Sequence, residues 1–121
     1  MARILFIDDD PMTLETLTKA VEVFGHQALH AHNGKEGLKL ARQQSPDLIF
    51  TDLRLPDMEG LALVEQLQND PQTAPIPVLV LSASPALDET ERAQSAGAQG
   101  YINKPIRLQA LLELIQKHCA S

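Results

Sequence analysis

The stretch that decides the fold lies in the middle of the chain, and it reads Asp47-Leu48-Ile49-Phe50-Thr51-Asp52-Leu53-Arg54-Leu55-Pro56-Asp57-Met58-Glu59-Gly60. Its first part is a short apolar run of residues that favour β-strands. The run ends at a carboxylate, Asp52, and a loop containing Pro56 and Gly60 follows. A buried strand that stops at an aspartate presents that carboxylate at the rim of a sheet. Asp52 is therefore the first candidate for a functional residue.

Three other strand-like runs also stop at polar groups. They are Ile4–Ile7 before Asp8, Asp9 and Asp10, Val78–Leu81 before Ser82, and Tyr101–Asn103 before Lys104 and Pro105. In open α/β sheets, ligands bind outside the carboxyl ends of the strands. We therefore expect these polar groups and Asp52 to converge on one site.

Strand and helix patterns alternate along the whole chain. The expected strands cover residues 3–7, 27–32, 47–51, 78–81 and 100–103. The expected helices run from Pro11 to a stop at Gly25, from Asn33-Gly34 to Ser45-Pro46, over 58–69 and 87–96, and through Leu108, Leu111, Leu112 and Ile115. Parallel strands need crossover connections of a dozen or more residues. The alternation therefore predicts an α/β fold, a doubly wound five-stranded parallel sheet between two layers of helices.

Bulk properties narrow the class of protein. A length of 121 residues with 44% hydrophobic content suits one globular domain over residues 1–121. A net charge of −6 without any Lys/Arg run argues against a nucleic-acid-binding surface in this segment. No apolar run approaches the ~20 residues of a membrane span, and the N-terminus does not resemble a signal peptide. A single cysteine, Cys119, fits a reducing compartment, so we expect a cytoplasmic protein without membrane contact.

The acidic strand ends favour a magnesium site. Asp8, Asp9 and Asp52 would repel one another if the first and third strands are neighbours, and a hard divalent cation removes that repulsion. Mg²⁺ takes one or two carboxylates and fills its other positions with water and phosphate oxygens. For Asp8 to Asp10 alone, a solvated acidic loop that caps the first helix is an open alternative.

Lys104 and Ser82 extend this hypothesis to a phosphoryl group. Beside a Mg²⁺–carboxylate site, the ammonium and the hydroxyl could both hold phosphoryl oxygens, although each could also be an ordinary strand-end residue. Phosphoryl transfer depends mainly on positioning and charge neutralisation, and a carboxylate can act as its nucleophile. The strand ends together thus predict an aspartyl-phosphate site.

The chain resembles the receiver domain of response regulators in two-component signalling, over essentially all of its length. The motifs that carry the resemblance are residues 4–11, residues 47–60, Val80-Leu81-Ser82-Ala83, and residues 97–105. The resemblance implies a flavodoxin-like (βα)5 fold with the strand order 2-1-3-4-5, counted along the chain. It also implies that the Lys104–Pro105 peptide bond is cis.

The resemblance assigns a role to each candidate site residue. Asp52 would be the phosphoacceptor. Asp9, Asp52 and the backbone carbonyl of Arg54 would bind Mg²⁺ directly, and Asp8 would help through water. The phosphoryl oxygens would be held by Ser82, Lys104 and the backbone N–H of Ala83. Such a domain would catalyse only its own phosphorylation and dephosphorylation, as a signalling switch.

The implied switch connects the site to partner proteins. After phosphorylation of Asp52, Ser82 would move toward the phosphoryl group and Tyr101 would turn inward; as an alternative, Tyr101 is simply a half-buried strand aromatic. This would reshape an effector surface over 87–96 and 101–119. The phosphoryl donor would be a histidine kinase or a histidine phosphotransfer protein, docked at the start of the first helix (Pro11, Met12, Leu14 and Glu15) and the loop after Pro105.

Two other functions fit parts of the sequence. A phosphohydrolase of the haloacid dehalogenase type has a strand followed by Asp-x-Asp, which would make Asp8 the nucleophile and Asp10 the general acid/base. That hypothesis leaves residues 47–60 without a role. A pseudo-receiver, an interaction module with the same fold and no phosphorylation, would not need the set formed by Asp9, Asp52, Ser82 and Lys104.

Overall fold

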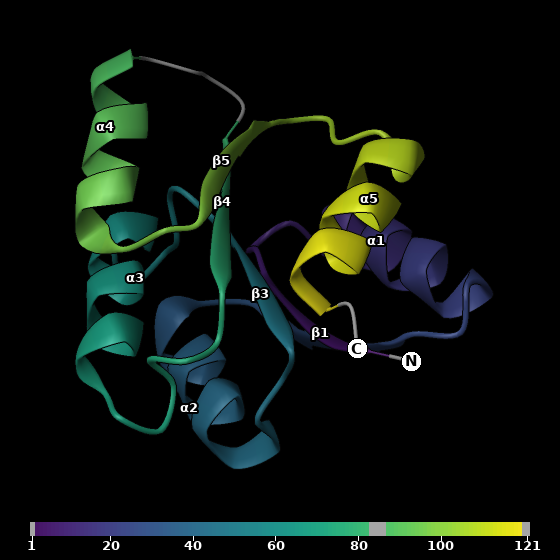
Figure 1. Ribbon diagram of the computed structural model, residues 1–121, viewed down its shortest axis with the longest axis horizontal. Coiled ribbons are helices and arrows are strands. Elements are labelled where there is room, and N and C mark those ends of the chain that lie inside the picture. The colour runs from purple at the N-terminus through teal and green to yellow at the C-terminus, as the bar shows by residue number, and fades with distance from the viewer. Residues whose placement is uncertain (1, 83–86, 120–121) are drawn as a thin grey trace.

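The computed structural model is an α/β domain with five strands and five helices in strict alternation (Figure 1). It describes residues 2–82 and 87–119, and for residues 87–91 the backbone alone. The strands are β1 (Arg3–Ile7), β2 (Gln27–Ala31), β3 (Leu48–Asp52), β4 (Val78–Ser82) and β5 (Gly100–Asn103). The helices are α1 (Pro11–Val23), α2 (Gly34–Gln44), α3 (Gly60–Asn69), α4 (Leu87–Ala96) and α5 (Leu108–Cys119).

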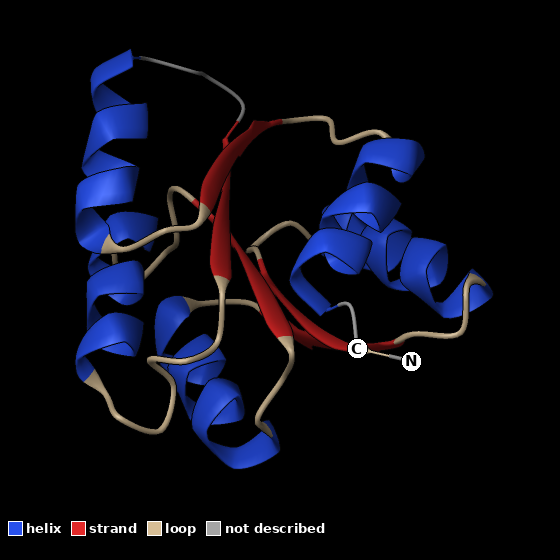
Figure 2. Cartoon of the chain, viewed as in Figure 1, coloured by secondary structure: helices blue, strands red, loops and turns tan. Residues whose placement is uncertain are grey.

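The strands form one parallel sheet in the order β2-β1-β3-β4-β5, so the predicted fold class and strand order are confirmed. Two helix layers enclose it: α2, α3 and α4 cover one face, and α1 and α5 cover the other (Figures 1 and 2). The strand order reverses between β1 and β3, which lie side by side in register, with Ile7 opposite Thr51. This reversal is the topological switch point at which such sheets bind ligands.

The alternation of side chains along the strands separates the two cores. In β1, Ile4 and Phe6 face α1 and α5, whereas Leu5 and Ile7 face the other helix layer. All four side chains are at most 1% exposed. Strands buried on both faces are mostly apolar along their length, which explains the hydrophobic runs over residues 4–7 in β1, 48–50 in β3 and 78–81 in β4.

Helix ends follow the expected signals. Asp10 caps α1 by accepting a hydrogen bond from the Met12 N–H, and Asn33 caps α2 by accepting one from the Glu36 N–H. Gly25 has φ +86°, the left-handed conformation that ends α1.

Four expected elements have bounds that are wrong by one or two residues. The second strand ends at Ala31 rather than residue 32, because Ala31 is the last residue paired with β1. The third strand is shifted by one residue because Asp52 still pairs with Leu81 in the ladder. The fourth strand ends at Ser82 rather than residue 81, because Ser82 still pairs with Asn103. Helix α3 begins at Gly60 rather than Met58, because the Gly60 N–H is bound to the Leu53 carbonyl and residues 58–59 belong to the preceding loop.

Candidate functional site: carboxylates and a lysine at the strand ends

Four strands deliver polar side chains to the same edge of the sheet. Asp8 directly follows β1, Asp52 ends β3, Ser82 ends β4 and Lys104 directly follows β5. The register places Asp52 opposite Leu81, one residue before Ser82, and Ser82 opposite Asn103. The predicted convergence of the strand ends is therefore present.

Three carboxylates form a compact cluster at the switch point. Asp8, Asp9 and Asp52 each offer an oxygen, and these oxygens lie within 4.8 Å of one another. Asp8 is buried, Asp52 is partly buried and Asp9 is exposed, so the cluster opens to solvent on one side. Among the described residues, this is the one group of three or more carboxylate, imidazole or thiolate ligands close enough to share a metal ion.

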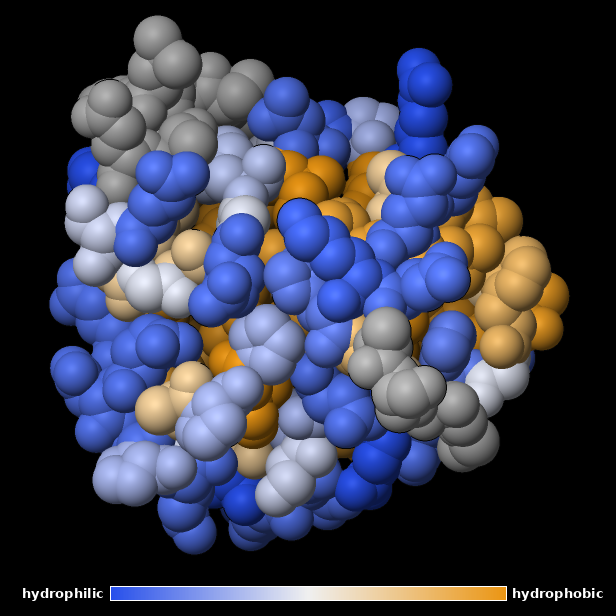
Figure 3. Space-filling model, in the orientation of Figure 1, coloured by the Kyte–Doolittle hydropathy of each residue, from blue (hydrophilic) through white to orange (hydrophobic). Residues whose placement is uncertain are grey.

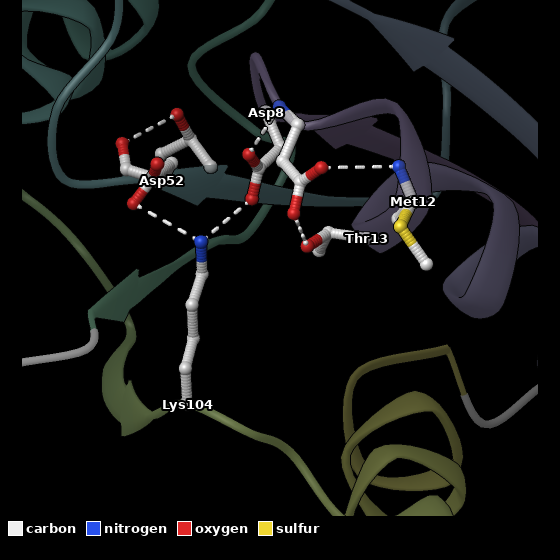
Figure 4. A network of polar contacts seen from close by, with 7 residues as sticks. Asp8, Met12, Thr13, Asp52 and Lys104 are labelled. Atoms are coloured by element: carbon white, nitrogen blue, oxygen red, sulfur yellow. Dashed lines mark hydrogen bonds and ion pairs between the residues drawn. The ribbon is translucent and has the colours of Figure 1, made fainter.

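Lys104 enters the cluster between the two less exposed carboxylates (Figure 4). Its Nζ lies 2.7 Å from Asp8 Oδ2 and 3.4 Å from Asp52 Oδ1. Its backbone N–H donates to the carbonyl of Ser82 (2.7 Å), and the peptide bond to Pro105 is cis, as predicted. Three carboxylates around one ammonium leave two negative charges uncompensated among these four side chains.

The electrostatics of the two partly buried groups follow from this arrangement. Burial raises the pKa of Asp52, the charge of Lys104 opposes that effect, and the charge of Asp8 adds to it. For Lys104, burial alone would lower the pKa, but the hydrogen bond to Asp8 and the charge of Asp52 outweigh it, so its pKa is raised. The ammonium is held charged, whereas the Asp52 carboxylate is the destabilised anion of the site.

Asp10 does not belong to the cluster. Its carboxylate accepts hydrogen bonds from the Met12 N–H (3.1 Å) and the Thr13 hydroxyl (2.8 Å), as Figure 4 shows around Met12 and Thr13. The hydrogen bond from Thr13 and the one from Met12 lower the pKa of Asp10. Helix capping thus applies to Asp10, as one alternative predicted, and a low-pKa capping carboxylate is poorly suited to the acid/base role of a dehalogenase-type site.

The other predicted site residues lie around this cluster. Ser82 is buried, and Tyr101 in β5 is partly buried against the core beneath α3 and α4. Arg54 is exposed in the loop after β3 and forms an isolated antiparallel bridge with Glu59. Ala83 lies outside the described residues.

Two residues near the site were not singled out by sequence reasoning. The carboxylate of Asp57 accepts hydrogen bonds from the N–H groups of Gly34 (2.8 Å) and Lys35 (2.9 Å), across 23 and 22 positions. At Gly60, a Cβ atom would lie 2.2 Å from the carbonyl oxygen of Asp52. The sequence pattern marks Gly60 only as a loop residue, and nothing local in the sequence pairs Asp57 with α2.

Comparison with known proteins agrees with this geometry. The model of the response regulator receiver domain family matches residues 4–116, and the chain belongs to that family. It is 37% identical to Protein PilH of Pseudomonas aeruginosa, over 95% of each chain. It is 30% identical to the polar-differentiation response regulator DivK of Brucella anthropi, over 95% of this chain and 94% of DivK.

Solved structures give the same result. The chemotaxis protein CheY4 of Vibrio cholerae superimposes with a TM-score of 0.91 at 25% identity, over 98% of both chains. A CheY-like receiver domain protein from Methanospirillum hungatei gives 0.90 at 30% identity, over 97% of this chain and 92% of that one. The chain is thus a receiver domain of the two-component type, a class that acts as signalling switches. Within the described residues, the helices are all too short or too polar to cross a lipid bilayer.

Proposed function

We propose that Asp52 accepts a phosphoryl group from a phosphohistidine of a histidine kinase or a histidine phosphotransfer protein. The observation that carries this proposal is the position of the Asp52 carboxylate, 3.4 Å from the Lys104 ammonium and beside Asp8 and Asp9 at the switch point. In the transfer, a carboxylate oxygen of Asp52 attacks phosphorus, the P–O bond forms and the P–N bond to imidazole breaks. The protein catalyses only this transfer and the later hydrolysis of the aspartyl-phosphate, in which water attacks phosphorus, the bond to the Asp52 oxygen breaks and inorganic phosphate leaves.

The donor atoms suit Mg²⁺. All three clustered side chains offer oxygen, the ligand type that Mg²⁺ prefers, and the two uncompensated negative charges match a divalent cation. Asp9, Asp52 and the backbone carbonyl of Arg54 would hold the ion directly, and Asp8 would hold it through water. When bound, the ion supplies neutralisation of charge on the phosphoryl oxygens.

Ser82, Lys104 and the backbone N–H of Ala83 hold the transferred group in this proposal. Lys104 contributes a fixed positive charge, because its raised pKa keeps the ammonium protonated. Ser82 ends the strand next to β3, so its hydroxyl has a short path toward a phosphoryl group on Asp52.

Ser82 at the end of β4 and Tyr101 in β5 would transmit the signal. Phosphorylation adds roughly −1.5 to −2 charge, which draws Ser82 toward Asp52 and lets Tyr101 turn inward. The effector surface over 87–96 and 101–119 changes as a result. The Ser82→Ala variant should still accept phosphate on Asp52, but its phosphorylation should leave the environment of Tyr101 unchanged. Tyrosine fluorescence can follow this environment. An unaltered Tyr101 response in that variant would remove Ser82 from the switch.

The donor protein would dock beside α1 and the loop after Pro105. A groove of about 280 Å³ there is lined by Met12, Thr13, Thr16, Leu17, Leu81, Lys104, Pro105 and Ile106. The described large hydrophobic residues that are most exposed, Met12, Val23, Phe24 and Leu108, all lie in or next to α1 or α5. Hydrophobic surface is visible at the right edge of the molecule in Figure 3, on the side of α1 and α5. Leu14, expected in the docking surface, is 3% exposed and packs in the core instead.

Labelling with acetyl phosphate tests the proposal. The wild-type chain should incorporate phosphate with Mg²⁺ and lose labelling with a chelator, and Asp52→Asn should not be labelled. Asp70→Asn is a matched control, because Asp70 is a loop carboxylate at the opposite edge of the sheet that also accepts a backbone hydrogen bond. Labelling of Asp52→Asn would move the site elsewhere. A folded wild-type chain that never labels would identify a pseudo-receiver.

The proposal also covers the domain organisation and the compartment of the protein. Residues 1–121 would form a single receiver domain, and the reducing compartment would be the cytoplasm, where Cys119 stays a thiol.

A further inference from the structure

The loop between β3 and α3, residues 53–59, is closed at its base. The Gly60 N–H donates to the Leu53 carbonyl (2.6 Å), Arg54 bridges to Glu59, and the Leu55 N–H donates to the Met58 carbonyl (3.1 Å). Gly60 also packs directly on the Asp52 carbonyl. The loop therefore leaves the site residue Asp52 and returns to it within a few residues.

The tip of this loop is bound to a different helix. Asp57 accepts hydrogen bonds at Oδ1 from the Gly34 N–H (2.8 Å) and at Oδ2 from the Lys35 N–H (2.9 Å). These are two of the four donors that the first turn of a helix leaves without an internal partner. Asn33 satisfies the next donor, that of Glu36. The N-terminus of α2 thus needs Asp57, a residue from outside the helix, to complete its capping.

Side-chain packing strengthens the same junction. A Cβ atom at Gly34 would lie 2.5 Å from the Met58 sulfur, so the absence of a side chain at Gly34 lets Met58 pack against the helix start. A negative charge at a helix N-terminus is also favoured by the helix dipole. Backbone hydrogen bonds from Gly34 and Lys35 outweigh the effect of burial and lower the pKa of Asp57, so its carboxylate is ionised at neutral pH.

We propose that Asp57 is a positioning residue for the metal site, because it anchors the tip of the loop that carries the Arg54 carbonyl to the N-terminus of α2. This inference rests on the proposed function, in which that carbonyl binds Mg²⁺. With the base closed at Gly60 and the tip anchored at α2, the backbone of Arg54 has little freedom to turn. Loss of the anchor leaves Asp8, Asp9, Asp52 and Lys104 intact but frees the one ligand that comes from a loop backbone.

Three variants of the full chain separate positioning from helix capping. Asp57→Ala removes the anchor, Asn33→Ala removes a cap of the same helix without touching the loop, and Asp70→Asn changes a carboxylate at the far edge. Mg²⁺ titrations followed by amide NMR, and the Tm of each metal-free protein, are the readouts. Residues that support metal ligands typically contribute about 10- to 100-fold in affinity. We expect about tenfold weaker Mg²⁺ binding in Asp57→Ala, while Asn33→Ala lowers Tm and keeps its Mg²⁺ affinity.

Hydrogen exchange of the metal-free protein adds a measurement that does not need Mg²⁺. The amides of Leu55 and Gly60 should exchange faster in Asp57→Ala than in Asn33→Ala. Asp57→Asn, which keeps one acceptor oxygen, should lie between wild type and Asp57→Ala, and it replaces the alanine variant if that one does not fold. Equal Mg²⁺ affinity or equal exchange in the Asp57 and Asn33 variants would overturn the positioning role. A wild-type chain without Mg²⁺ binding would instead overturn the proposed function.

Discussion

Polar groups are paired at the amino edge of the sheet, whereas like charges lie close together at its carboxyl edge. At the amino edge, Arg3 donates its backbone N–H to Asp47 and its guanidinium to the side chains of Gln27 and Gln44 and to the Gln44 carbonyl, over 2.8 to 3.2 Å. These contacts join β1 to β2, α2 and the start of β3. Each contact pairs a donor with an acceptor, so this edge stabilises the fold.

At the carboxyl edge, like charges are crowded instead. Asp8 and Asp52 share the single ammonium of Lys104, and Asp9 lies beside them. Buried like charges disfavour folding, and a sequence selected only for stability would not place them together. The carboxyl edge therefore keeps negative charge that suits a cationic ligand, whereas at the amino edge the protein's own groups pair with one another.

Glycine-to-alanine substitutions should give the largest difference in unfolding free energy between the two edges of the sheet. Gly60→Ala places a Cβ against the Asp52 carbonyl, 2.2 Å away, so the backbone must move, and we expect a loss of about 3 kcal/mol in unfolding free energy. Gly25→Ala, near the amino edge, meets no atom within 4 Å and costs only about 1 kcal/mol for its left-handed φ. Urea denaturation measures both. Equal losses would contradict the close approach at Gly60.

Removal of the lysine should have the next largest effect. Lys104→Met keeps the stem but leaves the buried carboxylate of Asp8 without its cation, and we expect about 2 kcal/mol of destabilisation, reduced by the solvent access of the Lys104 side chain. Added Mg²⁺ should recover part of the loss by mass action. A variant as stable as wild type without Mg²⁺ would show that the carboxylates do not depend on Lys104.

Asp52→Asn should stabilise the metal-free protein while it abolishes phosphorylation. Burial raises the pKa of Asp52, so the folded chain binds that proton more tightly than the unfolded chain does. The stability linked to this proton is present below the ordinary pKa near 3.8 and is lost as pH rises through the raised value. At neutral pH the variant should therefore melt a few degrees higher than wild type. The difference should vanish in acid, and thermal melts at both pH values test this; a constant difference would refute the assigned cause.

At the amino edge, Arg3→Ala should change stability alone. The loss of its partly exposed hydrogen bonds should cost about 1 kcal/mol, measured by urea denaturation. Labelling with acetyl phosphate should stay at the wild-type rate, because Arg3 lies at the opposite end of β1 from Asp8. A slower rate in a folded Arg3→Ala protein would show that the two edges are coupled.

Much of the fold could be predicted because its signals are local. The apolar runs of β1, β3 and β4, the cap at Asn33 and the stop at Gly25 each depend on a few neighbouring residues. Boundary errors arose where tertiary pairing overrode the local pattern, as at Asp52, which the ladder with β4 includes in the strand.

The features of the candidate site likewise fall into those that local sequence predicts and those that depend on tertiary packing. The residue pattern alone identifies which polar residues end the strands, because strand ends are marked by the change from apolar to polar residues. Alternation with helices then places the carboxyl ends of all the parallel strands at one edge of the sheet. Three features follow from the packing of the folded chain instead. Lys104 contacts Asp8, 96 positions away, more closely than Asp52; Asp10 turns away to cap α1; and Asp57 accepts hydrogen bonds from the start of α2. Such contacts depend on distances between elements far apart in the chain, which no local pattern encodes.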